Sequence, residues 1–521
     1  MIKKRIDFLF KSKRIYFVFL ALVIVDRLFL LTNFSFKFVG SDDMIFWEAS
    51  HDYLQGKFYA PYFYGQDYNF MLESLFAVPL LALNVPYYQA LPISTSFIAL
   101  FPFVFFSYTL FKRGYVTESI FIISIPLLLP IEYGMLSSMT RGFIQGLFFC
   151  GFLVLPLLEP LKKSSWIIFS TMTAAAYVFN PNAVLFLFPV CLYMWMSNFK
   201  QIRFYLITVL CALPILSIEY FSQQFFVSNK ETIIHRKPVL EYSFNVCLDS
   251  LKELDIYFSN FSPLTWFAGW LSLVIAFIIG IALLRRDVKK GVSLILGVLF
   301  ILSTLGFNKT HDRLDTIFLS SQRMFLAIPL FIGLAAYWGR DLLAVSNNYF
   351  KVGLLATVIC TLCIKLSLLN AVIDQHTKEK NYGSISIKKV KDLTCECARI
   401  KDTLTIYPVD LIIYSASWQK HLNSAVMEFC NYGCPLLEKG FPTSMMSIYD
   451  RRSWVFNQKK SAVVKNILIY NSDADFNILQ SMKNCKLLTT QDPKMFIISN
   501  NTLPTDSLFR LLKLDLWMKA P

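Results

Sequence analysis

Long apolar runs separated by short polar segments dominate the first 373 residues of the chain. A helix needs about 20 consecutive, mainly apolar residues to cross a bilayer. Runs that approach this length predict about eleven membrane-spanning helices, at 15–34, 90–111, 116–133, 141–158, 165–179, 182–198, 204–226, 263–284, 291–307, 322–339 and 352–373. The run 72–83 is apolar but shorter, so we expect a helix that lies in or dips into the outer leaflet.

The pattern changes after residue 373, where short apolar segments alternate with helix-like segments. The strand-like segments are 405–407, 410–414, 466–470 and 495–499, and the helix-like ones are 420–430 and 474–482. This alternation predicts a small α/β domain. The expected fold is therefore mainly α. It comprises a polytopic transmembrane helical bundle at 1–373, with a large external loop at 37–89, and a small extramembrane α/β domain at 374–521.

Composition and charge agree with a membrane protein. The chain of 521 residues is 55% hydrophobic and 16% charged, whereas soluble domains carry about 25% charged residues. Much of the net charge of +15 lies in short loops between apolar runs, where Lys and Arg set topology. We expect a multi-pass protein of a bacterial inner membrane, with a retained first span, a cytoplasmic N-terminus and a periplasmic C-terminal domain. No basic stripe with interleaved aromatic residues occurs, which argues against nucleic acid as a partner.

Asp42 and Asp43 form an acidic pair just after the first apolar run. A carboxylate in hydrocarbon is costly, so the pair should face water or a polar cavity. Two carboxylates could bind a divalent cation such as Mg²⁺ or Mn²⁺, or one could act as a general base. The alternative is a helix cap, in which Ser41 or Asp42 caps a helix that begins near Met44.

The rest of the external loop supplies further candidates. Tyr64 belongs to an aromatic stretch suited to stacking on sugar faces, or only to lying at the headgroup level of the membrane. Glu73, at the start of the short helix, is a second catalytic carboxylate candidate. Its alternative role is that of a snorkelling or capping side chain.

Basic residues on the external side run against the charge pattern that sets topology. Such side chains suit a phosphate or pyrophosphate at the membrane surface, although long loops also carry solvated cations. The candidates for substrate binding are Arg141, His235, Arg236, His311, Arg313 and Arg323. Asp26 and Arg27, inside the first run, are expected to have a structural role.

The cysteines of the tail and the absence of common motifs limit the alternatives. Cys395 and Cys397, followed by Cys430 and Cys434, have poor spacing for a two-pair zinc site. Disulfides are favoured if the tail is external, and the pairing stays open. The sequence has no phosphate-cradling glycine loop, nucleophile elbow or His-Glu-x-x-His motif, which argues against a nucleotide-driven pump and the common hydrolases.

The chain resembles the GT-C membrane glycosyltransferases in the order of its first features. These are a basic N-terminus, one span, and then a large external loop that opens with an acidic pair. This superfamily includes the protein O-mannosyltransferases and the bacterial aminoarabinose transferase. The resemblance implies hexosyl or pentosyl transfer from a polyprenyl-phosphate donor to a glycan, lipid or protein acceptor on the non-cytoplasmic face, with inversion. It also implies an active-site acid, as base or metal ligand, at Asp42 or Asp43, with a slight preference for Asp43.

The sequence departs from this superfamily at 66–73, where relatives often carry a Lys- or His-Pro-Pro motif. We therefore place the donor phosphate at Arg141, Arg236 and Arg323. The rival functions are a lipid or polysaccharide transporter or flippase, and a non-catalytic membrane scaffold. A transporter should carry charges deep within several spans, and most of these apolar runs lack them.

Overall fold

The chain forms two compact units in a computed structural model. The first comprises 1–35, 92–221 and 238–383, and the second comprises 36–91, 222–237 and 384–521. The residues described are 14–233, 236–237, 239–311, 316–318, 320–342, 348–378, 387–414, 429–434, 444–447, 462–470, 485–490, 492 and 495–512.

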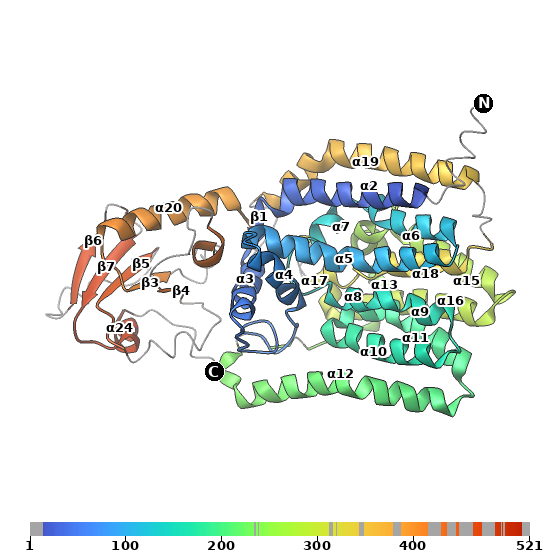
Figure 1. Cartoon of the computed structure of the whole chain (residues 1–521), viewed down its shortest axis with the longest axis horizontal. Coiled ribbons are helices and arrows are strands. Elements are labelled where there is room, and N and C mark those ends of the chain that lie inside the picture. The colour runs from blue at the N-terminus through green and yellow to red at the C-terminus, as the bar shows by residue number, and fades with distance from the viewer. Residues whose placement is uncertain are drawn as a thin grey trace. The chain divides into compact units, whose positions relative to one another are not determined.

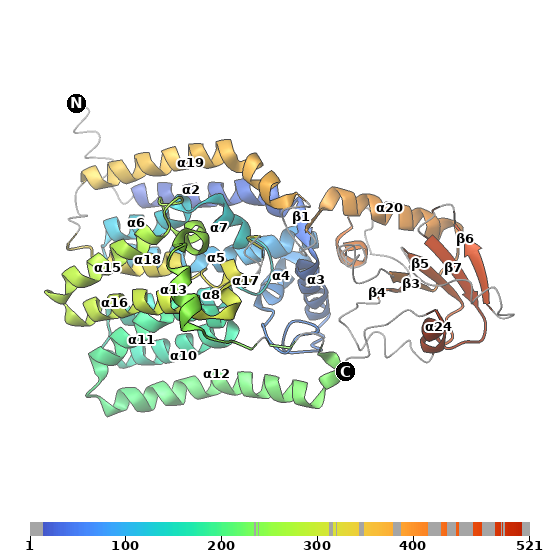
Figure 2. The same cartoon turned by 180° about the vertical axis from the view of Figure 1, so that it is seen from behind.

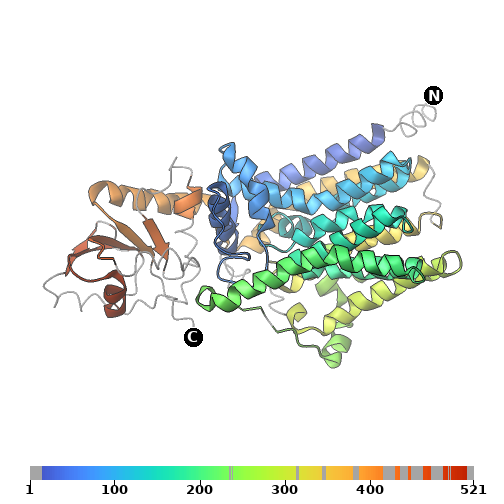
Figure 3. The ribbon, with the colours of Figure 1, turned by 60° about the horizontal axis from the view of Figure 1, so that its bottom comes forward.

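The first unit is helical, and many of its longer helices run alongside one another (Figures 1 and 3). Its elements begin with α2 (Arg14–Leu30), η1 (Leu31–Ser35), α5 (Tyr87–Lys112), α6 (Val116–Leu128), α7 (Ile131–Leu136), α8 (Gln145–Phe152), α9 (Val154–Leu158), α10 (Lys163–Phe179), η2 (Pro181–Ala183), α11 (Val184–Asn198) and α12 (Ile202–Ser228). They continue with α13 (Phe244–Ser250), α14 (Leu254–Phe258), η4 (Ser259–Phe261), α15 (Trp270–Leu284), α16 (Val288–Ser303), η5 (Thr304–Gly306), η6 (Asn308–His311), α17 (Ser320–Arg323), α18 (Ile328–Trp338) and α19 (Asn348–Thr377). The boundary between the units falls within α5 and α12.

Each predicted span contains a helix, and several of these helices are shorter than a membrane is thick. Within the described ranges, five are long and apolar enough to cross a bilayer: Arg14–Ser35, Tyr87–Lys112, Ile202–Ser228, Val288–Gly306 and Phe350–Thr377. This is the composition of an integral membrane protein. The predicted span 116–133 is divided, because α6 ends before Pro130 and α7 starts after it. The count of eleven spans therefore stays a prediction.

One apolar core joins the first and last of these long helices. Tyr16, Phe19 and Val23 are buried on one face of α2 at the spacing of a helix, and they form one cluster with residues of α6 and α19, Val358 among them. Figure 2 shows α2 and α19 side by side. The opposite face of α2 leaves Leu28 half exposed, as expected for a surface that meets lipid.

The second unit joins the loop after the first span to the C-terminal part of the chain. Its helices are α3 (Ser41–Leu54), α4 (Leu72–Ala82), η3 (Lys230–Thr232), α20 (Val390–Ile406), η9 (Phe429–Gly433) and α24 (Thr505–Leu511). Its strands are β1 (Phe38–Gly40), β2 (Ile387–Lys389), β3 (Leu411–Tyr414), β4 (Ser444–Ser447), β5 (Asn466–Tyr470), β6 (Cys485–Thr489) and β7 (Met495–Asn500). β1 pairs antiparallel with β2, and Trp47 of α3 packs against Phe429 of η9.

The larger sheet has the order β4-β3-β5-β7-β6, in which β4, β3 and β5 are mutually parallel. Alternate residues of a strand face opposite sides of a sheet. Ile413 and Ile469 therefore share an apolar cluster with Phe509 of α24. On the other face, Thr403 of α20 reaches Met495, and Figure 1 shows α20 and α24 on opposite sides of the sheet.

The sheet tests the predicted elements of the tail. The predicted strands at 410–414, 466–470 and 495–499 coincide with β3, β5 and β7. The strand predicted at 405–407 is wrong, because α20 runs through Ile406 and buries a helical face up to Thr403. β4 and β6 were not predicted, and 420–428 and 474–482 lie outside the described residues. A separate domain at 374–521 stays a prediction.

Candidate active site

The acidic pair stands at the first turn of α3. The helix begins at Ser41, three residues before the predicted start at Met44, and its N-cap is Gly40. The prediction of Ser41 or Asp42 as the cap is therefore wrong. Asp43 accepts a hydrogen bond from the Gly40 amide at 2.6 Å through Oδ2, which is the half of a capping box that a glycine N-cap allows. Asp43 is buried, with 6% of its surface exposed, whereas Asp42 is partly exposed.

A line of polar side chains continues from this pair along α3. Glu48 is buried, and Asp52 lies one turn further, on the same side of the helix. Asp52 Oδ2 accepts a hydrogen bond from Tyr64 Oη at 2.8 Å. Burial raises the pKa of Tyr64 well above its ordinary value, and the charges of Asp52 and Glu48 raise it further. The sequence analysis missed Glu48 and Asp52, although their four-residue spacing in the predicted helix was a usable signal.

Glu73 is fully buried in the first turn of α4. The predicted short helix is confirmed here, and the snorkelling alternative is wrong, because a snorkelling carboxylate keeps its charged end exposed. Helix α4 packs on α3 through hydroxyl groups: Ser74 Oγ donates to the Phe46 carbonyl at 2.9 Å, and Ser50 Oγ donates to the Ser74 carbonyl at 3.3 Å. A second carboxylate is thereby held against α3.

The basic segment of the second unit is only partly described. Arg236 is exposed, and His235 lies outside the described residues. The backbone beside Arg236 is held to the external loop, because Asp67 Oδ1 accepts from the Lys237 amide at 2.7 Å. Gln223 adds a hydrogen bond to the Asp67 carbonyl at 3.2 Å. Asp67 is therefore a backbone anchor for this basic segment.

Arg141 and Arg323 are both buried in the helical first unit, with 5% and 6% of their surfaces exposed. Arg141 Nη1 donates to the Phe318 carbonyl at 3.2 Å. The Arg323 guanidinium lies 4.0 Å above the centroid of the Phe143 ring, a cation–π contact that is strongest when desolvated. The two arginines thus connect residues 141–143 with Phe318 and Arg323.

Backbone contacts fix these two segments. Gly142 has a φ of +77°, a conformation that glycine adopts without strain. Asn180 Nδ2 donates to the Gly142 carbonyl at 3.0 Å, and Asn182 Nδ2 donates to the Arg323 carbonyl at 3.3 Å. Arginine buried inside a membrane bundle is a marker of function, because its burial is costly. The described geometry therefore offers two preorganised cations.

His311 is held within the first unit through both ring nitrogens. Nδ1 lies 3.0 Å from Tyr257 Oη, and Nε2 lies 2.7 Å from the Leu305 carbonyl. These contacts are those of a side chain that supports the fold, and its role in substrate binding stays a prediction. Arg313 lies outside the described residues.

No three His, Cys, Asp or Glu side chains gather into a metal-binding group within the described ranges. Oδ2 of Asp43 is occupied by the capping bond, and neighbouring positions on a helix do not face one another. These residues fit a metal ion poorly. Metal binding by Asp42 and Asp43 stays a prediction.

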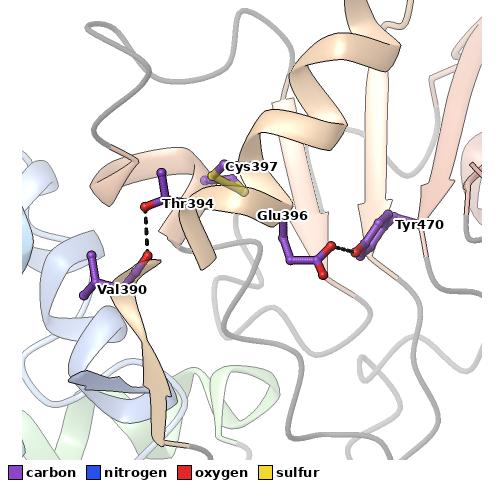
Figure 4. The surroundings of a disulfide bond; sticks show 6 residues. Val390, Thr394, Glu396, Cys397 and Tyr470 are labelled. Atoms are coloured by element: carbon purple, nitrogen blue, oxygen red, sulfur yellow. Dashed lines mark hydrogen bonds between the residues drawn. A yellow bond between two sulfur atoms is a disulfide. The ribbon is translucent and has the colours of Figure 1, made fainter. Parts of the chain in front are cut away.

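A disulfide takes the place of the zinc alternative in the tail. Cys397 of α20 is bonded to Cys430 of η9, and Cys395 is a free thiol. Figure 4 shows Glu396, next to Cys397 in the chain, accepting a hydrogen bond from Tyr470 of β5. The disulfide ties α20 to the segment that packs on Trp47.

In fold the protein is similar to a GT-C glycosyltransferase, and the expectation of a GT-C-like architecture is confirmed. The similar protein is ArnT, the aminoarabinose transferase of Cupriavidus metallidurans. Its apo crystal structure aligns with a TM-score of 0.52 and 10% identity over 93% of this chain and 97% of ArnT. The crystal structure of ArnT bound to undecaprenyl phosphate aligns with a TM-score of 0.47 and 9% identity over 93% and 98% of the two chains. No protein-family model and no curated protein matches the chain.

Proposed function

We propose that the protein is a glycosyltransferase that moves a hexosyl or pentosyl group from a polyprenyl-phosphate donor to an acceptor on the non-cytoplasmic face of the membrane. One observation carries this proposal. The ArnT-like fold extends over 93% of the chain, and the segment after its first helix opens α3 with the Asp42–Asp43 pair. The lipid-linked donor comes from analogy, because ArnT has been crystallised with undecaprenyl phosphate.

The acceptor hydroxyl needs a base in the transition state. Asp42 is the more exposed of the two carboxylates, whereas Asp43 uses Oδ2 to fix the start of α3. We therefore assign proton abstraction to Asp42 and its positioning to Asp43, which reverses the slight preference drawn from the sequence. The N-terminal end of a helix also stabilises negative charge, which suits a carboxylate at this position.

The leaving group is a lipid phosphate, whose growing negative charge is stabilised by preorganised cations. Arg141 and Arg323 suit this role, since their backbone is fixed and both are desolvated. The exposed Arg236 is a third candidate for the donor phosphate. Tyr64 and Glu73 are proposed to bind the sugar or the acceptor.

Asp42→Asn and Asp43→Asn, made separately, test the base assignment in membranes supplied with a polyprenyl-phosphate sugar. Asp42→Asn should lower kcat by about a hundredfold or more, because a general base contributes that much. Asp43→Asn keeps an oxygen for the Gly40 amide and should lose less. Asp249→Asn, an exposed carboxylate paired with Lys252, serves as the control. Full transfer by both variants at normal abundance would remove the catalytic assignment of Asp42 and Asp43.

A transporter is the alternative with an observation in its favour. Asp26 and Lys365 form an ion pair inside the helical unit, and charges at such positions often mark transport pathways. A transporter would move a fluorescent lipid-linked sugar across liposomes without transferring it, and would do so equally well with Asp42→Asn. A non-catalytic scaffold would be indifferent to the substitution in both assays.

A further inference from the structure

A pocket lies among α2, α7 and α19 of the first unit, and its empty space of about 430 Å³ includes open solvent. Its lining combines apolar side chains with the ionisable residues that the sequence analysis left in a structural role. The lining residues that matter are Asp26, Arg27, Phe29, Tyr133, Lys365 and Leu366.

The charges of the pocket do not cancel. Lys365 Nζ lies 2.8 Å from Asp26 Oδ1, which neutralises that pair. Arg27 points elsewhere: its terminal nitrogens donate to Ser137 Oγ at 3.1 and 3.2 Å and to the Gly134 carbonyl at 3.3 Å. Both acceptors are neutral, so two cations face one carboxylate in the pocket lining. With one carboxylate for two cations, the lining keeps a net positive charge, which favours an anion.

Tyr133 gives an independent sign of a ligand. Its side chain lines the pocket and only 2% of its surface is exposed. Its hydroxyl has no hydrogen-bond partner among the described residues. A buried polar group without a partner is costly, and an oxygen-rich ligand in the pocket would accept its proton.

The surroundings of the pocket point to lipid as the source of that ligand. Phe29 and Leu366 line the pocket and are nevertheless 45% and 50% exposed, so they lie where it reaches the surface. Val25 and Leu28 of α2 extend the same exposed apolar surface. A ligand that enters across this surface contacts apolar side chains, which suits the acyl chains of a lipid and not free phosphate.

We propose that this pocket binds the phosphate group of an anionic membrane lipid, with Arg27 and Tyr133 as hydrogen-bond donors and the acyl chains along the exposed faces of α2 and α19. The site uses none of the residues assigned to sugar transfer, so its failure and the failure of the proposed function are separate outcomes. A lipid bound in this pocket would contact both α2 and α19.

Native mass spectrometry of the delipidated full-length protein, titrated with phosphatidylglycerol, tests the site. We expect one tightly bound lipid, and Arg27→Gln should weaken its binding by about tenfold or more, as loss of a charge-assisted hydrogen bond predicts. Tyr133→Phe should weaken it by about threefold and should not lower the melting temperature of the lipid-free protein, since its hydroxyl has no partner to lose among the described residues. The second variant keeps the test decisive if Arg27→Gln fails to fold.

Three controls accompany the titration. Arg285→Gln removes an exposed arginine of the same unit and should leave binding unchanged. Phosphatidylcholine, which has no net charge, should bind more weakly than phosphatidylglycerol. Inorganic phosphate should neither stabilise the protein nor displace the lipid. Equal lipid binding by wild type and both pocket variants, or equal protection by inorganic phosphate, would overturn the proposal.

Discussion

Tyr64 and Asp52 form a hydrogen bond of 2.8 Å that holds the external loop against α3. Burial and the Asp52 charge raise the pKa of Tyr64, so the folded protein keeps this phenol neutral. In the unfolded chain a tyrosine ionises near pH 10. The stability that neutral Tyr64 contributes is therefore fully present below about pH 10 and is lost as the pH rises towards the higher folded pKa.

Tyr64→Phe makes this relationship measurable. At pH 8 the variant should be less stable by about 1.5–3 kcal/mol, because it loses a hydrogen bond to a charged group. As the pH rises above 10, the phenol of wild type ionises in the unfolded chain but not in the folded protein, so wild type loses stability. Tyr64→Phe has no phenol and does not lose this stability, so the difference in melting temperature between the two proteins should shrink. Melting curves at pH 8, 9, 10 and 11 check this. Two parallel pH profiles would show that Tyr64 titrates normally in the folded protein.

The capping bond from Gly40 to Asp43 predicts different effects of two substitutions. Asp43→Ala should destabilise the protein by about 1 kcal/mol, the usual cost of a lost cap interaction. Asp43→Asn should cost less, because the amide oxygen can still accept the bond. Thermal unfolding in detergent measures both, with Asp249→Ala as the exposed control. If Asn and Ala destabilise equally, Asp43 stabilises the protein through its charge and not through the cap.

Local sequence patterns predicted most of the helices and several strands. They could not predict which strands far apart in the chain pair with each other. Each apolar run does contain a helix, because burial from water acts on every residue of a run independently of its partners. The antiparallel pairing of Phe38 with Lys389 joins positions that no local pattern relates. This pairing is also why residues 36–91 form one unit with the tail, contrary to what their place among the apolar runs suggests.

In the candidate site, too, local sequence predicted some residues, whereas others were recognised only from contacts between distant parts of the chain. Asp42 and Asp43 were found because two adjacent charges stand out after an apolar run, whereas Asp52 became notable only through its contact with Tyr64. The segment 405–406 has a strand-like sequence but lies in the last turn of α20, where tertiary burial of Ile400 and Thr403 overrides local preference. Likewise, the partner of Cys397 could not be deduced from four cysteines in two pairs.

The disulfide between Cys397 and Cys430 closes a loop across 33 positions of the chain. A cross-link of this length restricts the unfolded chain and typically stabilises by about 2–4 kcal/mol. Cys397→Ser and Cys430→Ser should each lower the melting temperature, and a reducing agent should lower that of wild type to the same value. Cys395→Ser, an exposed free thiol on the same helix, is the matched control. A melting temperature of wild type that does not respond to reductant would contradict a stabilising disulfide.

The cation–π contact between Arg323 and Phe143 links packing to the proposed chemistry. If Arg323 binds the donor phosphate, Arg323→Gln should lower kcat/KM by about tenfold to a hundredfold through loss of a charge-assisted hydrogen bond. Phe143→Leu keeps the charge and loses the aromatic face, worth about 1–2 kcal/mol when desolvated. It should therefore raise KM for the donor by several fold and change kcat less. Phe188→Leu, which disrupts a ring stack with Phe300 in the same unit, controls for lost packing. Equal KM values for the two phenylalanine variants would show that the Phe143 ring does not position a donor-binding guanidinium.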